Sequence, residues 1–226
     1  MKIKKTIHEW FPSKIYINNS EKSLDDHTII LHDAMSRMKG VILKTDPSDG
    51  ILKNSKEEYI SLQKMHWGDS EYFGKEFLNP IYKEIFNFIN KASNEYVSKL
   101  NIDKSKFKVN MTSAYLNKCN HETGPQSNHN HIGSLFSFTY YFHLEGDIQP
   151  IKIYSPVLFP SFAPLSLVAP QEFMTYIPQV GDVIIFPSFL YHEVPHNETG
   201  IRWLFNGDFH VYSDHFPNFP PVPTEI

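Results

Sequence analysis

Three histidines and one arginine are the residues of this chain whose types and spacing point to chemistry. His129 and His131 lie one residue apart, and His192 follows about sixty residues later. Ten residues beyond His192, Arg202 is a single cation in an apolar stretch. Neutral imidazoles bind iron, zinc, copper and nickel, and a guanidinium is the natural bidentate partner of a carboxylate. In this order the four residues predict one metal ion and one acidic ligand in a shared site.

His129 and His131 precede a segment whose alternation predicts a strand with two different faces. Side chains at i and i+2 point the same way in a strand, so both imidazoles can approach one point from a strand entrance. If the strand continues without a bulge, the same face carries Ser137, Thr139 and Tyr141. The opposite face carries four aromatic residues: Phe136, Phe138, Tyr140 and Phe142. We expect the polar face to line a cavity and the aromatic face to pack against helices.

His192 ends an apolar segment that begins at Asp182 and contains Pro187. A strand followed by a proline turn is a rigid way to bring a third imidazole to the first two. His196 is a rival for this position, but it adjoins a cluster of turn residues and is predicted to lie at the surface.

Arg202 lies in another strand-like segment, where alternation places it on one face with Leu204 and Asn206. An inward-facing guanidinium is costly unless it is paired, and no acidic residue is adjacent to it in this segment. We therefore expect a ligand's carboxylate to be its partner. Asn117 and Asn206 are candidates for orienting bound groups, and the alternative for both is a satisfied core amide.

Length and composition predict one globular domain, since β-barrels of about 200–250 residues are routinely single domains. The chain has 226 residues, of which 41% are hydrophobic and 15% aromatic. We expect one domain over residues 1–226, with helical support at about 20–100 and a β-barrel core at about 105–213. The net charge is −4 and the basic residues form no cluster, so the wide basic footprint of a duplex-binding protein is absent.

The order of the predicted elements favours an α+β, mainly β chain. Periodicity predicts a helix from about Ser20, capped by Ser20 or Ser23 and ended by Gly40, with Leu24, Leu31, Met35 and Met38 on its core face. A second helix is predicted at about 75–100. Residues 44–74 are expected to be loop with one short helix. A short β-like opening is expected over residues 8–18. Strands are predicted at 106–117, 134–144, 151–154, 172–177, 182–186 and 201–212, because these stretches are apolar or aromatic and are bounded by turn residues.

Several of these stretches together resemble the 2-oxoglutarate/Fe(II)-dependent oxygenases found in phages and bacteria. The resemblance covers nearly the whole chain, and its specificity comes from the ordered combination of short motifs. They are the opening Trp10–Tyr16, then Asn128–His131 with Ser137–Tyr141, then Phe186–Val194, and finally Arg202–Asn206.

This resemblance implies a double-stranded β-helix (a cupin-like jelly roll), ferrous iron, 2-oxoglutarate as co-substrate and dioxygen. It implies a hydroxylase that decarboxylates 2-oxoglutarate to succinate, with a peptidyl or small-molecule substrate as our expectation. By position, His129 and His192 would bind iron and Arg202 would bind the distal carboxylate of 2-oxoglutarate. Tyr141 or Ser137 would add a hydrogen bond there.

One departure concerns the third ligand. The superfamily commonly has His-X-Asp or His-X-Glu, whereas this chain has His129-X-His131. Either His131 replaces the carboxylate in a three-histidine site, which we favour, or water or chloride completes two protein ligands. Asp147 is a less favoured third ligand, because Gly146-Asp147 is typical of a turn.

Two other functions fit parts of the pattern. One is a cupin-like three-histidine dioxygenase that acts without 2-oxoglutarate, and the other is a non-enzymatic β-sandwich binding module with incidental histidines. Arg202 distinguishes the first from the oxygenase, since a direct dioxygenase does not need a buried cation at this place.

Cysteine usage and hydropathy predict a cytoplasmic protein without a membrane partner. Cys119 is the single cysteine, so an internal disulfide framework is excluded and a reducing compartment is favoured. We expect Cys119 to be a small buried residue. No signal peptide is apparent, and no stretch approaches the roughly 18 apolar residues of a membrane span.

Overall fold

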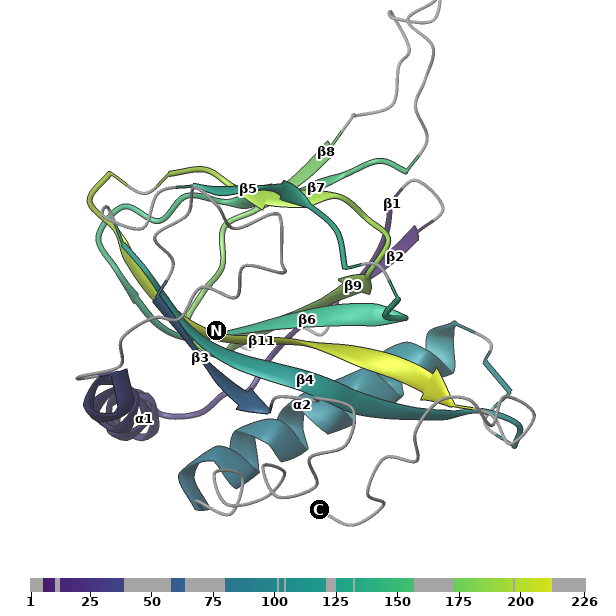
Figure 1. Cartoon of the computed structure of the whole chain (residues 1–226), viewed down its shortest axis with the longest axis horizontal. Coiled ribbons are helices and arrows are strands. Elements are labelled where there is room, and N and C mark those ends of the chain that lie inside the picture. The colour runs from purple at the N-terminus through teal and green to yellow at the C-terminus, as the bar shows by residue number, and fades with distance from the viewer. Residues whose placement is uncertain are drawn as a thin grey trace, which may run out of the picture.

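The computed structural model consists of two facing antiparallel β-sheets with two helices on the outer face of the larger one (Figure 1). It describes residues 6–10, 13–38, 58–63, 80–100, 102–103, 105–120, 125–131, 133–156, 173–196 and 198–212. Among these, no helix is long and apolar enough to cross a membrane.

The larger sheet has seven strands in the order β1-β2-β9-β6-β11-β4-β3. Their bounds are β1 Thr6–Trp10, β2 Ser13–Asn19, β9 Asp182–Pro187, β6 Phe136–Glu145, β11 Ile201–Tyr212, β4 Lys108–Cys119 and β3 Glu58–Gln63. The smaller sheet has the order β5-β10-β7-β8, with bounds Gln126–His129, His192–Val194, Ile151–Tyr154 and Phe173–Tyr176.

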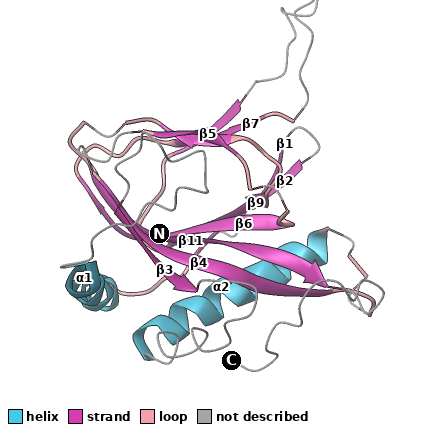
Figure 2. Cartoon of the chain, in the orientation of Figure 1, coloured by secondary structure: helices cyan, strands magenta, loops and turns pink. Residues whose placement is uncertain are grey.

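From β4 onward the chain winds between the two sheets. It passes from β4 to β5 in the smaller sheet, returns as β6, crosses again to β7 and β8, and repeats this as β9, β10 and β11 (Figure 2). Every pair of neighbouring strands in the described residues is antiparallel. This winding is the double-stranded β-helix that the family resemblance implied, and the fold class is confirmed.

Two hydrophobic cores follow from the alternation of β6. Its aromatic face (Phe136, Phe138, Tyr140 and Phe142) packs with both helices, as predicted. Its other face carries Tyr141, which joins apolar residues of β7, β9 and β10 between the sheets. A single strand therefore separates the supporting core from the interior where the histidines lie.

The helices run over Leu24–Met38 (α1) and Pro80–Lys99 (α2). Ser23 caps α1: its hydroxyl accepts the N–H of Asp26 at 3.1 Å, and its own N–H donates to the Asp26 carboxylate at 3.2 Å. This reciprocal pair is a capping box, so the predicted start of the helix is confirmed.

The predicted core face of α1 is wrong at two positions. Leu24 is 75% exposed and Met35 is 53% exposed. The buried side chains are instead His27, Ile30 and Ala34. Polar His27 belongs to the buried face because hydrogen bonds satisfy both of its ring nitrogens, a compensation that apolar periodicity cannot detect.

Three strands were absent from the sequence expectations. β3 lies in the region expected to be loop with a short helix, while β5 and β10 are the short strands that carry His129 and His192. The last two have three or four residues and are mostly polar, so they lack the apolar or aromatic run by which the other strands were predicted. The sequence allows Trp67 and Tyr72 either to cover the mouth of the site or to pack in the interior, and both lie outside the described residues.

Buried His27 fixes α1 to the larger sheet. Its Nδ1–H donates to the Ser23 carbonyl at 2.9 Å, so Nε2 accepts from the Tyr140 hydroxyl, also at 2.9 Å. Tyr140 lies 3.0 Å from the Ser20 hydroxyl as well. Burial is the main cause that lowers the pKa of His27, and the neutral ring is the form this network requires.

We expect the His27 network to make the protein less stable in acid. The folded-state pKa lies below the unfolded value of about 6.5, so the stabilising contribution is complete above that pH and decreases as the pH falls toward the folded-state pKa. Between pH 7.5 and 5, the free energy of unfolding should fall more in the wild type than in His27→Gln, as measured by urea titration. His32→Gln, at an exposed position of the same helix, is the control. Its free energy of unfolding should decrease as much as that of the wild type. Equal losses in all three proteins would contradict this role of His27.

Candidate metal and carboxylate site

Strand pairing in the smaller sheet places His129 directly opposite His192. The centroids of their rings are 4.3 Å apart. His131 follows β5, and its backbone N–H donates to the Ser188 carbonyl at 2.9 Å, which ties this residue to the turn before β10. The ring of His131 lies 5.2 Å from each of the other two. The structure thus brings together the three histidines that the sequence singled out.

Each imidazole is oriented through its Nδ1 atom. His129 Nδ1 lies 2.7 Å from the Ser127 carbonyl and His192 Nδ1 lies 3.1 Å from the Leu190 carbonyl. A carbonyl only accepts, so both Nδ1 atoms carry the hydrogen and both Nε2 atoms keep a free lone pair. His131 Nδ1 faces a carboxylate, which gives the same tautomer. Within the described part of the chain, the three rings form a group whose ligand atoms lie within 4.8 Å of one another.

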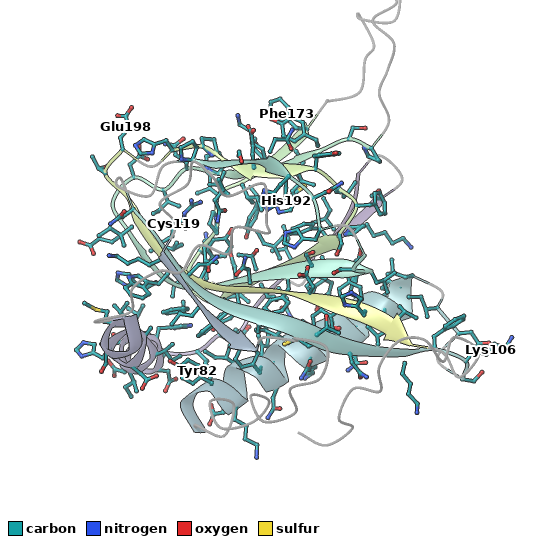
Figure 3. The ribbon with its side chains drawn as sticks, viewed as in Figure 1. Tyr82, Lys106, Cys119, Phe173, His192 and Glu198 are labelled. Carbon is teal, nitrogen blue, oxygen red and sulfur yellow. The ribbon has the colours of Figure 1, made fainter. Side chains whose placement is uncertain are left out.

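Burial keeps two of the rings neutral. It is the main cause that lowers the pKa of His192 to about 3, with further lowering by His129 and His131. It also lowers the pKa of His129. Burial alone would lower the pKa of His131 too, but the hydrogen bond and charge of Asp208 outweigh it and raise that pKa. Figure 3 shows His192 between the two sheets.

Asp208 is a site residue that the sequence analysis missed. Its carboxylate oxygens lie 3.0 Å and 3.3 Å from His131 Nδ1. Ser137 donates to the same carboxylate at 2.6 Å, and the hydroxyl of Ser188 lies 2.8 Å from that of Ser137. The signal was available: alternation from Arg202 through Leu204 and Asn206 reaches Asp208 next. The hydroxyl proton of Ser137, expected to serve the co-substrate, is used by Asp208 instead.

Arg202 is 2% exposed and lies in the same cavity as the histidines. Its Nε has no hydrogen-bond partner among the described residues. The wall of this cavity includes Tyr141, Thr139 and Asn206. Burial raises the pKa of Tyr141, and the nearby guanidinium partly offsets this effect.

Two buried amide oxygens complete the polar wall. The Oδ1 atoms of Asn117 and Asn206 accept no hydrogen bond from the described residues. Register places Asn117 opposite Leu204, in the row of residues that faces the cavity. A buried polar atom without a partner costs free energy, so such atoms are typical of sites that a ligand completes.

The remaining candidates lie away from this cluster. His196 and Asp147 are exposed, and Asp147 follows Gly146, whose φ of 74° belongs to a turn. His143 lies 3.6 Å from the carboxylate of Glu145 on the same strand. Cys119 is buried, as expected.

Comparison with known families gives a match over residues 113–205, to the family described as "Putative 2OG-Fe(II) oxygenase". This segment holds all three histidines and Arg202, and it ends before Asp208. The resemblance inferred from the sequence is confirmed for this segment. No relative of the chain was found among curated proteins.

Solved structures of low sequence identity share the fold. The non-heme alpha ketoglutarate-dependent epimerase SnoN from nogalamycin biosynthesis is 10% identical with a TM-score of 0.58, and the match covers 93% of this chain and 88% of SnoN. A prolyl hydroxylase from Trichoplax adhaerens, solved with a peptide of hypoxia inducible factor, is 12% identical with a TM-score of 0.55 and coverages of 92% and 87%. A Pseudomonas putida prolyl-4-hydroxylase is 12% identical with a TM-score of 0.51 and coverages of 87% and 92%.

The geometry generates a prediction about the third ligand. If His131 binds the metal, His131→Ala should weaken the affinity for Co(II) at least tenfold, because one of three protein ligands is lost. Anaerobic titration of the visible Co(II) spectrum measures this. His196→Ala is the control, since that ring is exposed and outside the cluster. Unchanged affinity in His131→Ala would favour two protein ligands completed by water or chloride.

Proposed function

We propose that this protein is an Fe(II)- and 2-oxoglutarate-dependent oxygenase that uses His129, His131 and His192 to bind iron and Arg202 to bind the co-substrate. One observation carries the proposal: three imidazoles with free Nε2 lone pairs share a cavity with a fully buried guanidinium. The family matched by residues 113–205 supports the same chemistry.

The residues fit the implied groups. Three neutral nitrogen donors on one side of a site suit iron and leave coordination positions open. A buried Arg202 whose Nε lacks a described partner suits a carboxylate, which can accept two parallel N–H bonds from one guanidinium. Bound iron supplies the activation of dioxygen that couples decarboxylation of 2-oxoglutarate to oxidation of a substrate C–H bond.

The residues of the chain contribute binding, orientation and exclusion of water. The carbonyls of Ser127 and Leu190 hold the rings of His129 and His192 at fixed angles. The aromatic ring of Phe186 packs edge-on against His192, with centroids 4.8 Å apart, and shields it from solvent. Tyr141 and Asn206 line the wall around Arg202 and are the proposed hydrogen-bond partners of the co-substrate.

Both rival functions account for fewer of these features. A three-histidine dioxygenase without 2-oxoglutarate gives no reason to bury Arg202 in the cavity. A non-enzymatic β-sandwich gives no reason for three oriented imidazoles with converging lone pairs.

The substrate proposed here is a peptide side chain or a small molecule. SnoN has been solved with Fe3+, alpha ketoglutarate and nogalamycin RO, and the Trichoplax adhaerens enzyme with a peptide fragment, so this fold accommodates both kinds of substrate. The net charge of −4 disfavours duplex nucleic acid.

Joint binding of iron and 2-oxoglutarate is directly measurable. Anaerobic addition of Fe(II) and then 2-oxoglutarate should produce a weak visible charge-transfer band that requires both additions. The band should be absent in His192→Ala, because that ring is lost from the cluster, and present in the exposed-site control His196→Ala. Folded wild-type protein that gives no band would contradict the proposal.

Arg202 should control the co-substrate requirement. A charged hydrogen-bonded contact contributes about 1.5–3 kcal/mol, so Arg202→Ala should raise the 2-oxoglutarate concentration for half-maximal band intensity by roughly 10- to 150-fold. Arg202→Lys keeps the charge but loses the planar guanidinium, so its 2-oxoglutarate requirement should lie between those of the wild type and Arg202→Ala. Lys106→Ala, remote from His192 in Figure 3, is the control. An unchanged 2-oxoglutarate requirement in Arg202→Ala would show that Arg202 does not bind the co-substrate.

A further inference from the structure

Asp208 contacts a proposed iron ligand but lies outside the ligand set. Its carboxylate receives the His131 Nδ1–H at 3.0 Å and 3.3 Å, and its side chain is 13% exposed. The other two rings donate to neutral backbone carbonyls. Of the three imidazoles, His131 is thus the one whose Nδ1–H donates to a negatively charged group. It is also the one that occupies the usual place of an Asp or Glu ligand.

Two buried serines fix this carboxylate. Ser137 donates to Asp208 Oδ1 at 2.6 Å, so the Ser188 hydroxyl, 2.8 Å away, donates to Ser137. Ser188 is fully buried and Ser137 is 2% exposed. The backbone carbonyl of Ser188 also accepts from the N–H of His131. Ligand, carboxylate and serines therefore form one connected network from β6, β11 and the turn before β10.

The charge of the ligand set explains what this network is for. Three neutral imidazoles leave a divalent cation one unit more positive than two imidazoles and a carboxylate would. A carboxylate that accepts a hydrogen bond from a ligating imidazole makes the ring a stronger donor and fixes its tautomer. We propose that Asp208 is a positioning residue that supplies, through His131, the negative charge that this ligand set lacks. The inference rests on the proposed function, since it requires His131 to bind the metal.

Asp208→Asn tests the charge with little change of shape. We expect the affinity for Fe(II) and Co(II), measured anaerobically by competition with a chelator, to fall by 10- to 100-fold, the usual effect of losing such a partner. The midpoint potential of the Fe(III)/Fe(II) couple should become more positive, because the removed charge stabilises the ferric ion. A purely structural role would loosen the ring without moving the potential in this direction.

Glu193→Gln is the matched control. Glu193 is adjacent to His192 in sequence and also loses one negative charge in the variant, but its carboxylate pairs with Lys152 at 3.1 Å and does not contact an imidazole. The Fe(III)/Fe(II) midpoint potential of the Glu193→Gln variant should stay near that of the wild type. An Asp208→Asn potential that shifts no more than the Glu193→Gln potential would overturn the inference.

Ser137→Ala keeps the test decisive if Asp208→Asn does not fold. This variant retains the charge of Asp208 but removes the hydroxyl that donates to its carboxylate. The metal affinity should therefore fall, but by less than the tenfold minimum expected for Asp208→Asn. Unchanged affinity in folded Ser137→Ala would also overturn the inference. Failure of the proposed function is distinguishable, because wild-type protein would then give no charge-transfer band with Fe(II) and 2-oxoglutarate, whatever the variants do to metal affinity.

Discussion

The antiparallel pairing of β5 with β10 is the contact on which the site depends. Each strand has three or four residues, and the register sets His129 opposite His192. Neither strand is stabilised by a long ladder of its own, so both rely on the larger sheet, which fixes the start of β6 and the end of β9. The chain thus uses a rigid seven-stranded support to hold a short and otherwise weak pair of strands in register.

Electrostatics explains why the polar groups are distributed as they are. The interior between the sheets contains a buried guanidinium, neutral rings and, behind one ring, a carboxylate bound by serine. Isolated charges in such a place are costly, and each here has either a partner in the chain or a place where a ligand would provide one. The aromatic core on the other side of the same strands offsets the unfavourable free energy of burying Arg202.

The sequence predicted this arrangement where the pattern was long enough. Alternation in β6 and β11 identified both faces correctly, including Tyr141 and Arg202, because ten or more consecutive residues repeat the same period. It missed β5 and β10, whose three or four residues are mostly polar and lack the apolar or aromatic run that marked the equally short β7 and β8. It also misplaced the core face of α1, because His27 is buried by hydrogen bonds rather than by hydrophobicity. Asp208 was overlooked since its role comes from a contact between strands distant in sequence, although the alternation that found Asn206 extends to it.

The two-faced strand β6 links correct folding to assembly of the site. A shift of one residue in its pairing would exchange its faces, placing phenylalanine rings beside the histidines and Ser137 against the helices. The partner strand β11 pairs with β6 across an irregularity between Trp203 and Leu204, which sets the register locally. A chain with β6 in the wrong register would therefore lose its apolar packing and its metal-binding cluster together. Metal binding is thus restricted to molecules in which this strand is paired correctly.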